Sequence, residues 1–263
     1  MDFLGKKIYF LDMDGTIYHE TKIIDGALEF FNECNKQGIQ YVFLTNNSSK
    51  NNITYYNKLT KMGIPCTLND FYSSIDATIF YIKEKGYKDV YLVGTTDFYN
   101  VLKEHVNVHI GAYYEHVDAV VIGFDTELNY EKLRCASFHL ENGVDYIATN
   151  PDFRCPIEDG RYIPDCGTLI YMFLKTTERS PFVIGKPRPF MIEAVLKERG
   201  LKKEDAVMIG DRIYTDIMCG LNAGVDSILV MSGETDSKIL EESKEKPTLT
   251  LDSIKDVYTI IKR

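Results

Sequence analysis

The sequence contains no tryptophan and only five histidines among 263 residues. It also has no apolar run near the roughly 18 residues that a membrane span requires. Positive charge is scarce as well, because 30 lysine and arginine residues face 39 acidic residues and give a net charge of −9. A protein that neutralises a nucleic-acid backbone over a broad face carries the opposite sign. We therefore expect no nucleic acid polymer and no membrane among its partners.

Cysteine patterns typical of disulfide frameworks or metal sites are missing too. The six cysteines form no Cys-x-x-Cys pair. The first seven residues include two lysines, but no apolar stretch with a small-residue cleavage site follows them. Both features favour thiols packed as small hydrophobic groups in a reducing compartment, so we expect a cytoplasmic protein.

Apolar residues make up 44% of the chain and charged residues 26%, which is typical of a globular protein. Short apolar runs alternate with longer amphipathic stretches. The predicted strands cover residues 8–11, 40–44, 90–93, 119–122, 146–148, 182–184, 206–209 and 227–230. The predicted helices cover residues 27–37, 49–62, 76–85, 130–141, 189–199 and 215–223. This alternation indicates an α/β fold with a doubly wound parallel sheet (Rossmann-like) and helices on both of its faces.

One interval is too rich in elements to be a simple crossover between two strands. From about Tyr87 to Glu178 it contains several strand and helix candidates of its own. We therefore predict an inserted α/β domain at residues 83–179, within a core domain made of residues 1–82 and 180–263.

Polar residues directly follow four of the apolar runs, at residues 12–16, 45–48, 185–187 and 210–216. In an open parallel sheet the ligand crevice lies outside the carboxyl ends of the strands, so segments far apart in sequence meet there. We expect these four segments to form one site.

Four aspartates dominate the expected site. Asp12 and Asp14 are two positions apart at one strand end, where their side chains lean to the same face, and Asp211 and Asp216 bring two more carboxylates. Crowded acids repel one another unless a divalent cation or protonation relieves them. An all-oxygen cluster suits Mg²⁺, so we expect a magnesium-dependent site.

The other residues complete a phosphoryl-transfer site. Lys186 supplies a positive charge, while Thr45 and Asn46 offer donors to phosphate oxygens. Asp12 would attack phosphorus and form an aspartyl-phosphate, and Asp14 would protonate the leaving oxygen. Burial or neighbouring negative charge must then raise the pKa of Asp14 above the value of about 3.9 for a free aspartate.

In order and spacing, the segments 12–16, 45–47, 186–187 and 210–216 resemble the four motifs of the haloacid dehalogenase superfamily of phosphatases. The segments 148–152, 184–187 and 215–217 are similar to its NagD-type subfamily, class IIA, which has a large C2 cap. That subfamily includes nitrophenyl phosphatases, nucleotidases and pyridoxal phosphate phosphatases. The resemblance runs from Lys7 to about Gly233, and it is specific because all four motifs occur in order around a large insertion.

The resemblance implies a role for each matching position. Asp12 is the expected nucleophile and Asp14 the general acid and base. Mg²⁺ is expected on the carboxylates of Asp12 and Asp211 and on the backbone carbonyl of Asp14, with Asp216 in support. The remaining expectations are a phosphoryl group held by Thr45, Asn46, Asn47 and Lys186, a tight turn at Gly15 and loop support from Thr16.

The insertion would be the cap, with substrate-selecting residues near 150–152. One position there departs from the family pattern, because Asp165 stands where relatives tend to have the first glycine of Pro-Gly-x-Gly. Aspartate adopts positive φ less readily than glycine, so we expect an altered cap rim. Tyr113 and Tyr114 could stack on a nucleobase, but core packing is the favoured interpretation. His19 is the one histidine near the expected nucleophile.

The sequence thus predicts a Mg²⁺-dependent phosphatase of small phosphorylated metabolites, such as nucleoside monophosphates, sugar phosphates or aryl phosphates. One alternative is a halide-removing hydrolase, which needs neither a leaving-group acid nor a metal, so Asp14 and Asp211 argue against it. The other is a non-hydrolytic regulator that binds phosphorylated metabolites, but every catalytic position is present. The sequence leaves the substrate and a homodimer open.

Overall fold

The structure is a computed structural model that describes residues 5–157 and 160–262; the predicted domains also include residues 1–4, 158–159 and 263, which lie outside this part. The chain divides into two compact units. Unit 1 comprises Met1–Thr45, Asn52–Tyr72 and Lys186–Arg263, and unit 2 comprises Asn46–Asn51 and Ser73–Gly185. The units change over at Ser73 and Lys186 rather than at 82/83 and 179/180, and unit 2 also takes the short segment 46–51.

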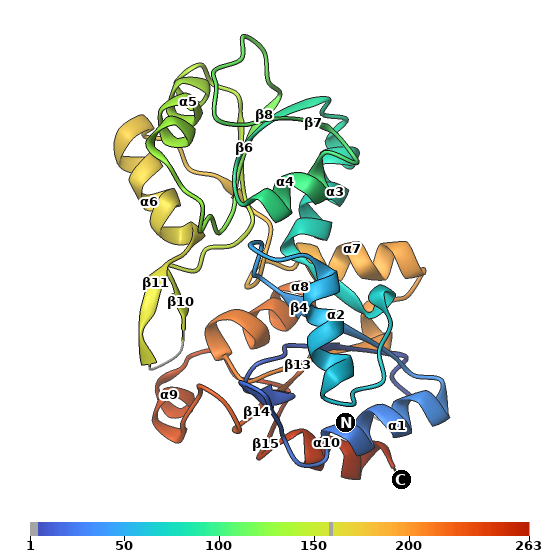
Figure 1. The fold of residues 1–263 in the computed structure, drawn as a ribbon. Helices are drawn as coiled ribbons and strands as arrows, with labels where there is room; N and C mark the ends of the chain where they lie inside the picture. The colour runs from blue at the N-terminus through green and yellow to red at the C-terminus, as the bar shows by residue number, and fades with distance from the viewer. Residues whose placement is uncertain (1–4, 158–159, 263) are drawn as a thin grey trace. The chain divides into compact units, whose positions relative to one another are not determined.

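Unit 1 is built on a six-stranded sheet with the order β15-β14-β13-β1-β4-β5 (Figure 1). Its strands are β1 (Ile8–Leu11), β4 (Gln40–Thr45), β5 (Phe71–Ser73), β13 (Ala206–Gly210), β14 (Asp226–Val230) and β15 (Leu249–Leu251). β1 pairs in parallel with both β4 and β13, so Leu11 lies opposite Phe43 and Ile209. All four residues of β1 are buried, which is typical of a central strand covered on both faces.

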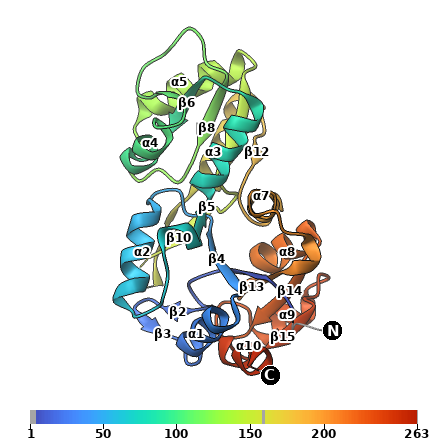
Figure 2. The same cartoon turned by 90° about the vertical axis from the view of Figure 1, so that its right-hand side faces the viewer.

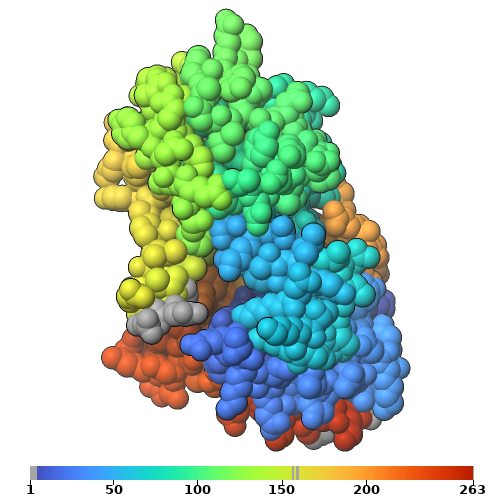
Figure 3. Space-filling view, viewed as in Figure 1, coloured from blue at the N-terminus to red at the C-terminus, as the bar shows by residue number. Residues whose placement is uncertain are grey.

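Helices cover the sheet of unit 1. They are α1 (Ala27–Gln37), α2 (Asn52–Lys61), α7 (Phe190–Arg199), α8 (Met218–Ala223), α9 (Ser237–Glu242) and α10 (Ile254–Ile261). α1 packs against α10, and α7 packs against α8 (Figures 1 and 2). Of the residues of α2, only Leu59 is buried, and this helix forms part of the surface of unit 1 in Figure 3.

Aromatic side chains fill much of the core between β1, β4 and α1. Tyr9 and Phe30 meet edge to face at 5.5 Å between ring centroids, and Phe31 meets Phe43 at 5.5 Å. Full burial of each such ring stabilises the fold by roughly 1.5–3 kcal/mol. The strand that carries the first candidate aspartate is therefore rigidly held.

Unit 2 has a five-stranded parallel sheet with the order β12-β9-β8-β6-β7. Its strands are β6 (Asp89–Val93), β7 (Asn107–His109), β8 (Ala119–Ile122), β9 (Asp145–Ala148) and β12 (Phe182–Val183). Its helices are α3 (Ser74–Lys85), α4 (Thr96–Leu102), α5 (Tyr130–Glu141) and α6 (Cys166–Thr177). α3 packs with α4 and α5 with α6, and Figure 1 shows the two pairs on opposite sides of the sheet.

The described residues also include two small hairpins and three short turns. The hairpins pair β2 (Tyr18–His19) with β3 (Lys22–Ile23) in unit 1, and β10 (Arg154–Pro156) with β11 (Tyr162–Pro164) in unit 2. The turns are 3₁₀ turns at Leu68–Asp70 and Lys203–Asp205 and a π-helical turn at Ile213–Ile217. Within the described residues, no helix is both long and apolar enough to cross a membrane.

The predicted parallel α/β fold is confirmed. The predicted strands at 8–11 and 119–122 and the predicted helices at 27–37 and 130–141 have the same bounds in the structure. The helix expected at 215–223 begins only at Met218, because the π-helical turn precedes it.

Two expectations about unit 2 are corrected. Asp165 does not need positive φ, since its φ is −114° and its side chain accepts from Cys166 N at the start of α6. Tyr113 and Tyr114 are not core residues, because they are 45% and 41% exposed. Tyr113 stacks on the His139 ring at 4.8 Å instead.

Candidate functional site

The loop after β1 turns tightly and directs two aspartates out of the sheet. Asp12 N donates to Ile209 O at 2.9 Å, which extends the pairing of β1 with β13. The Met13 carbonyl then accepts from Ile17 N at 2.8 Å and closes the turn. Gly15 has φ +80°, and a Cβ there would lie 2.6 Å from Asp211 Oδ2, so only glycine allows both the turn and the close approach.

Three carboxylates meet at this edge of the unit 1 sheet. Asp12 follows β1, Asp211 follows β13 and Asp216 lies in the π-helical turn, and one oxygen of each lies within 4.8 Å of the others. Asp211 is 2% and Asp216 1% exposed. Residues about two hundred positions apart thus form a single acidic cluster, as the strand ends predicted.

Lys186 lies among these acids and is itself buried. Its Nζ is 2.6 Å from Asp12 Oδ1 and 2.7 Å from Asp216 Oδ1, and it also donates to Leu44 O at 3.4 Å. Burial acts to lower the pKa of Lys186, but the two carboxylates more than offset this and raise it. Lys186 is therefore a permanent cation.

Further hydrogen bonds fix the carboxylates. Thr16 Oγ1 donates to Asp211 Oδ1 at 3.3 Å and Glu234 N donates to Asp211 Oδ2 at 2.7 Å. Arg212 N donates to Asp216 Oδ2 at 3.1 Å. Burial, with the neighbouring negative charges, raises the pKa of Asp211 to about 7 and that of Asp216 to about 6.

The cluster has more negative charge than Lys186 can balance. Oxygen donors of this kind are the ligands that hard divalent cations prefer. A bound cation would relieve the repulsion that raises the pKa of Asp211. The residues present therefore fit a metal ion, since Asp12, Asp211 and Asp216 each place one carboxylate oxygen in the cluster. Asp216 is also paired with Lys186 at 2.7 Å, which leaves Asp12 and Asp211 as the first candidates to hold the ion.

Asp14 is exposed at the rim of the same edge. Partial burial against the protein raises the pKa of its carboxyl, and the charge of Asp12 adds to the rise. Lys58, His19 and Arg212 act in the opposite direction. The pKa of Asp14 is thus raised overall, the direction that a general acid needs.

Lys58 is a residue near the site that the sequence analysis missed. It lies on α2, and its Nζ is 3.8 Å from the centroid of the Tyr18 ring. No motif marks it, since a lysine in an amphipathic helix is usually a solvent-facing residue. Only the packing of α2 beside the β2–β3 hairpin reveals that its charge acts on Asp14.

The predicted phosphate donors are divided between the units. Thr45 is the last residue of β4 in unit 1, whereas Asn46 and Asn47 open the segment that belongs to unit 2. Asn47 Oδ1 accepts from Ser49 N at 2.8 Å, which closes a local turn. Unit 1 by itself brings together Asp12, Gly15, Thr16, Lys186, Asp211 and Asp216.

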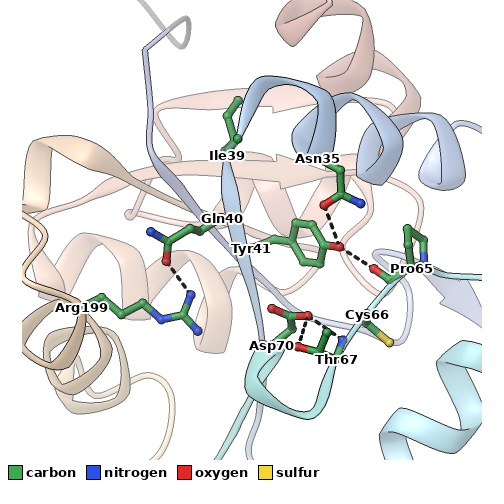
Figure 4. Close-up of a pocket in the computed structure, with 10 residues that line it drawn as sticks. Asn35, Ile39, Gln40, Tyr41, Pro65, Cys66, Thr67, Asp70 and Arg199 are labelled. Carbon is green, nitrogen blue, oxygen red and sulfur yellow. Dashed lines mark hydrogen bonds between the residues drawn. The ribbon is translucent and has the colours of Figure 1, made fainter.

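A different hollow, of about 570 Å³, lies at the opposite edge of the unit 1 sheet, where β4 begins at Gln40 (Figure 4). The polar groups that line it bond to one another: Tyr41 OH donates to Pro65 O, and Arg199 Nη1 donates to Gln40 Oε1 at 2.7 Å. Asp70 Oδ2 accepts from Thr67 N and its hydroxyl. None of the predicted site residues lines this hollow.

Comparison with known families gives two matches along the chain. A family model described as haloacid dehalogenase-like hydrolase matches residues 9–106, and one described as HAD-hydrolase-like matches residues 183–257. The first contains the loop after β1, and the second contains Lys186, Asp211 and Asp216.

Full-length relatives are also similar to this chain. The 5'-nucleotidase YutF of Bacillus subtilis is 34% identical over 94% of this chain and 96% of its own length. An acid sugar phosphatase of Staphylococcus aureus is 35% identical over 98% of both chains. The crystal structure of a 4-nitrophenylphosphatase from Thermotoga maritima superposes with a TM-score of 0.91, at 35% identity over 98% of both chains.

Proposed function

This chain belongs to the haloacid dehalogenase-like hydrolases, as a phosphatase of the NagD type, and we propose that it hydrolyses small phosphomonoesters with Mg²⁺ through an aspartyl-phosphate. The observation that carries the proposal is the cluster of Asp12, Asp211 and Asp216 around Lys186 at the carboxyl edge of the unit 1 sheet. That cluster combines a nucleophile, a cation and oxygen ligands for a metal.

In the first step, a carboxylate oxygen of Asp12 forms a bond to phosphorus while the ester P–O bond breaks. Asp14 donates its proton to the leaving oxygen, for which its raised pKa prepares it. In the second step, water attacks phosphorus, Asp14 accepts a proton from it and the Asp12–phosphorus linkage breaks. The products are the alcohol, inorganic phosphate and the original carboxylate.

Asp12, Asp211 and the backbone carbonyl of Asp14 would hold Mg²⁺, which neutralises charge on the phosphoryl oxygens when bound. Lys186 orients Asp12 through the 2.6 Å contact and adds positive charge beside the phosphoryl group. Asp216 holds Lys186 in place from the other side.

We assign the phosphoryl-binding donors to Thr45, Asn46, Asn47 and Lys186, with Gly15 and Thr16 shaping the loop. We also assign residues 83–179 to a substrate-selecting cap and the remainder to the catalytic core. The support is the compactness of unit 2, whose contacts separate it from unit 1 near these boundaries.

The activities for which the relatives are named cover three substrate classes: nucleoside monophosphates, sugar phosphates and aryl phosphates. We propose that the substrate belongs to one of them. We also propose a reducing, cytoplasmic environment, because the sequence has no Cys-x-x-Cys pair and Cys34, Cys135, Cys166 and Cys219 are buried as small apolar side chains.

Hydrolysis of p-nitrophenyl phosphate tests this function. We expect turnover with Mg²⁺, loss of turnover with EDTA and a fall of about 10⁴-fold or more in Asp12→Asn, because the amide is no nucleophile. Asp97→Asn, which changes an acid on α4, is the matched control and should retain activity. Turnover that persists with EDTA or in Asp12→Asn would refute the proposed mechanism.

A further inference from the structure

Unit 2 fixes the backbone of Asn46, the first residue of segment 46–51. The Asn46 carbonyl accepts from Asn150 Nδ2 at 2.9 Å and from Ser74 Oγ at 2.8 Å. Asn150 is 1% exposed and follows β9, and Ser74 begins α3. Two separate elements of unit 2 therefore hold the same carbonyl.

The rest of the segment is built into the carboxyl edge of the unit 2 sheet. Ser48 Oγ lies 2.9 Å from Thr149 Oγ1 and accepts from Phe124 N at 2.9 Å, and Thr95 Oγ1 donates to Ser49 O at 3.3 Å. Thr149, Phe124 and Thr95 come shortly after β9, β8 and β6. The segment thus has a defined position relative to three strand ends.

The side chain of Asn46 is oriented as well as placed. Its Nδ2 donates to Asp152 Oδ2 at 3.0 Å. An amide presents an NH₂ group on one side and an oxygen of similar shape on the other, but a carboxylate only accepts. If the Asn46 amide were reversed, its oxygen would face the Asp152 carboxylate, and neither group could donate a hydrogen bond. On its other side, a Cβ at Gly185 would lie 2.5 Å from Asn46 Oδ1, so glycine leaves the oxygen the space it needs.

Asp152 is held in its turn by the start of α6. Its carbonyl accepts from Gly167 N at 2.7 Å. Asp165, which caps α6, accepts from Asn150 Nδ2 at 3.4 Å. Burial raises the pKa of Asp165 to about 6, and the nearby charge of Asp152 contributes to the rise. Asn150, Asp152 and Asp165 therefore form one network around Asn46.

We propose that Asp152 is a positioning residue that selects the orientation of the Asn46 amide, so that its NH₂ group and not its oxygen serves the phosphoryl group of the substrate. The proposal rests on the proposed function, in which Asn46 is a phosphate donor. A carboxylate that accepts one amide hydrogen also polarises the amide and strengthens it as a donor.

Two measurements test the role of Asp152 independently. In ¹⁵N-labelled protein, the side-chain amide signals of Asn46, identified by their loss in Asn46→Asp, should shift and exchange faster in Asp152→Ala. With p-nitrophenyl phosphate, Asp152→Ala should raise KM and the inhibition constant of inorganic phosphate by about tenfold while kcat changes by less than about threefold. Asp97→Ala should alter neither, and Asp152→Asn, which keeps an accepting oxygen, should lie closer to the wild type.

The double variant Asn46→Ala/Asp152→Ala should bind phosphate no more weakly than Asn46→Ala, because Asp152 acts through Asn46. The proposal would be overturned if the double variant bound phosphate more weakly than Asn46→Ala by the factor that Asp152→Ala alone causes. Unchanged Asn46 amide signals in Asp152→Ala would also overturn it. If the wild-type protein hydrolysed no phosphomonoester, the proposed function would fail, whereas the amide signals would still decide the orientation of Asn46.

Discussion

Each unit contains a buried lysine with three acceptors, and the two lysines differ in the charge around them. Lys132 of unit 2 donates to Asp125 Oδ2 at 2.8 Å and to the carbonyls of Gly94 and Glu127 at 2.9 and 3.2 Å. Lys186 of unit 1 meets two carboxylates and the Leu44 carbonyl, with Asp211 as a third acid within the same cluster.

The difference separates an ion pair that we expect to be structural from the cluster that we propose as catalytic. The pair of Lys132 and Asp125 is balanced, one charge against one, and it joins α5 to the loop after β8. The cluster around Lys186 retains negative charge, and burial together with repulsion from Asp12 and Asp216 raises the pKa of Asp211. A cluster with excess negative charge becomes balanced when a cation binds, which is the reason that we propose this cluster, and not the Lys132 pair, as the functional site.

The largest expected effect on stability is in unit 2. Lys132→Met leaves the Asp125 carboxylate buried without its cation, and we expect the free energy of unfolding to fall by about 3–5 kcal/mol. Denaturant unfolding measures this loss, and turnover per folded molecule should be unchanged. Asp125→Leu added to Lys132→Met should recover much of the stability, and a loss below about 1 kcal/mol would mean that the pair is not structural.

Lys186→Met should give the opposite pattern. We expect kcat/KM for p-nitrophenyl phosphate to fall by about 10²–10³-fold, since a preorganised cation beside the phosphoryl group is lost. Stability should fall less than in Lys132→Met, because Asp216 and Asp211 have raised pKa values and take up protons. Steady-state kinetics and denaturant unfolding of both variants under the same conditions measure these two effects. If Lys186→Met lost more stability than Lys132→Met, the contrast between the two lysines would be wrong.

Mg²⁺ should stabilise the unbalanced cluster and not the balanced pair. At about 100 times its dissociation constant, Mg²⁺ should add about 2.7 kcal/mol to the free energy of unfolding. EDTA should remove this gain. Thermal unfolding with and without Mg²⁺ should show the gain in Asp125→Asn, though that variant starts from lower stability, and no gain in Asp211→Asn. A gain retained in Asp211→Asn would place the metal elsewhere.

The smallest expected effect concerns Asp165. Its carboxylate accepts hydrogen bonds from two neutral donors, Cys166 N and Asn150 Nδ2. Its pKa is raised from 3.8 to about 6 by burial, so the folded state binds its proton more tightly than the unfolded state. Its contribution to stability therefore increases as pH falls from above 6 toward 4.

Asp165→Asn removes that titration. We expect the variant to be more stable than the wild type by about 1–2 kcal/mol at pH 7.5, with the difference shrinking toward pH 4. Unfolding free energies across this pH range check the sign. A difference that grows at low pH would contradict the raised pKa.

The sequence allowed prediction of those site residues that directly follow strands. Asp12 and Asp211 stand out because each directly follows a buried apolar strand, and β1 and β13 are neighbours in one parallel sheet. Lys186 also follows an apolar run, but that run ends in β12 of the unit 2 sheet, so the strand-end argument does not account for its place beside Asp12. Lys58 was given no role, and Asp152 was expected only among the substrate-selecting residues near 150–152, because the contacts that they make join segments far apart in the chain.

The secondary structure shows the same contrast between features with a local sequence signal and features that depend on packing. Elements with a clear local signal, such as the amphipathic α1 and the apolar run of β8, were predicted with their bounds. α6 was missed, since its apolar run has no polar stripe to reveal a helical period, and the π-helical turn at Ile213–Ile217 has no local signal at all. Nothing in the sequence indicated that segment 46–51 packs with unit 2, because that depends on three strand ends about fifty to one hundred residues away.

The peptide bond between Thr45 and Asn46 is the first of four places where the chain passes from one unit into the other. A chimera that replaces residues 73–185 alone would keep the original segment 46–51. The hydrogen bonds of Asn46 with Asn150, of Ser48 with Thr149 and of Ser49 with Thr95 would then be lost. Recombination, natural or in the laboratory, must therefore carry this six-residue stretch together with the module it is anchored in. Thr45 and Asn46, which are adjacent residues of one motif, thus belong to different units of the molecule.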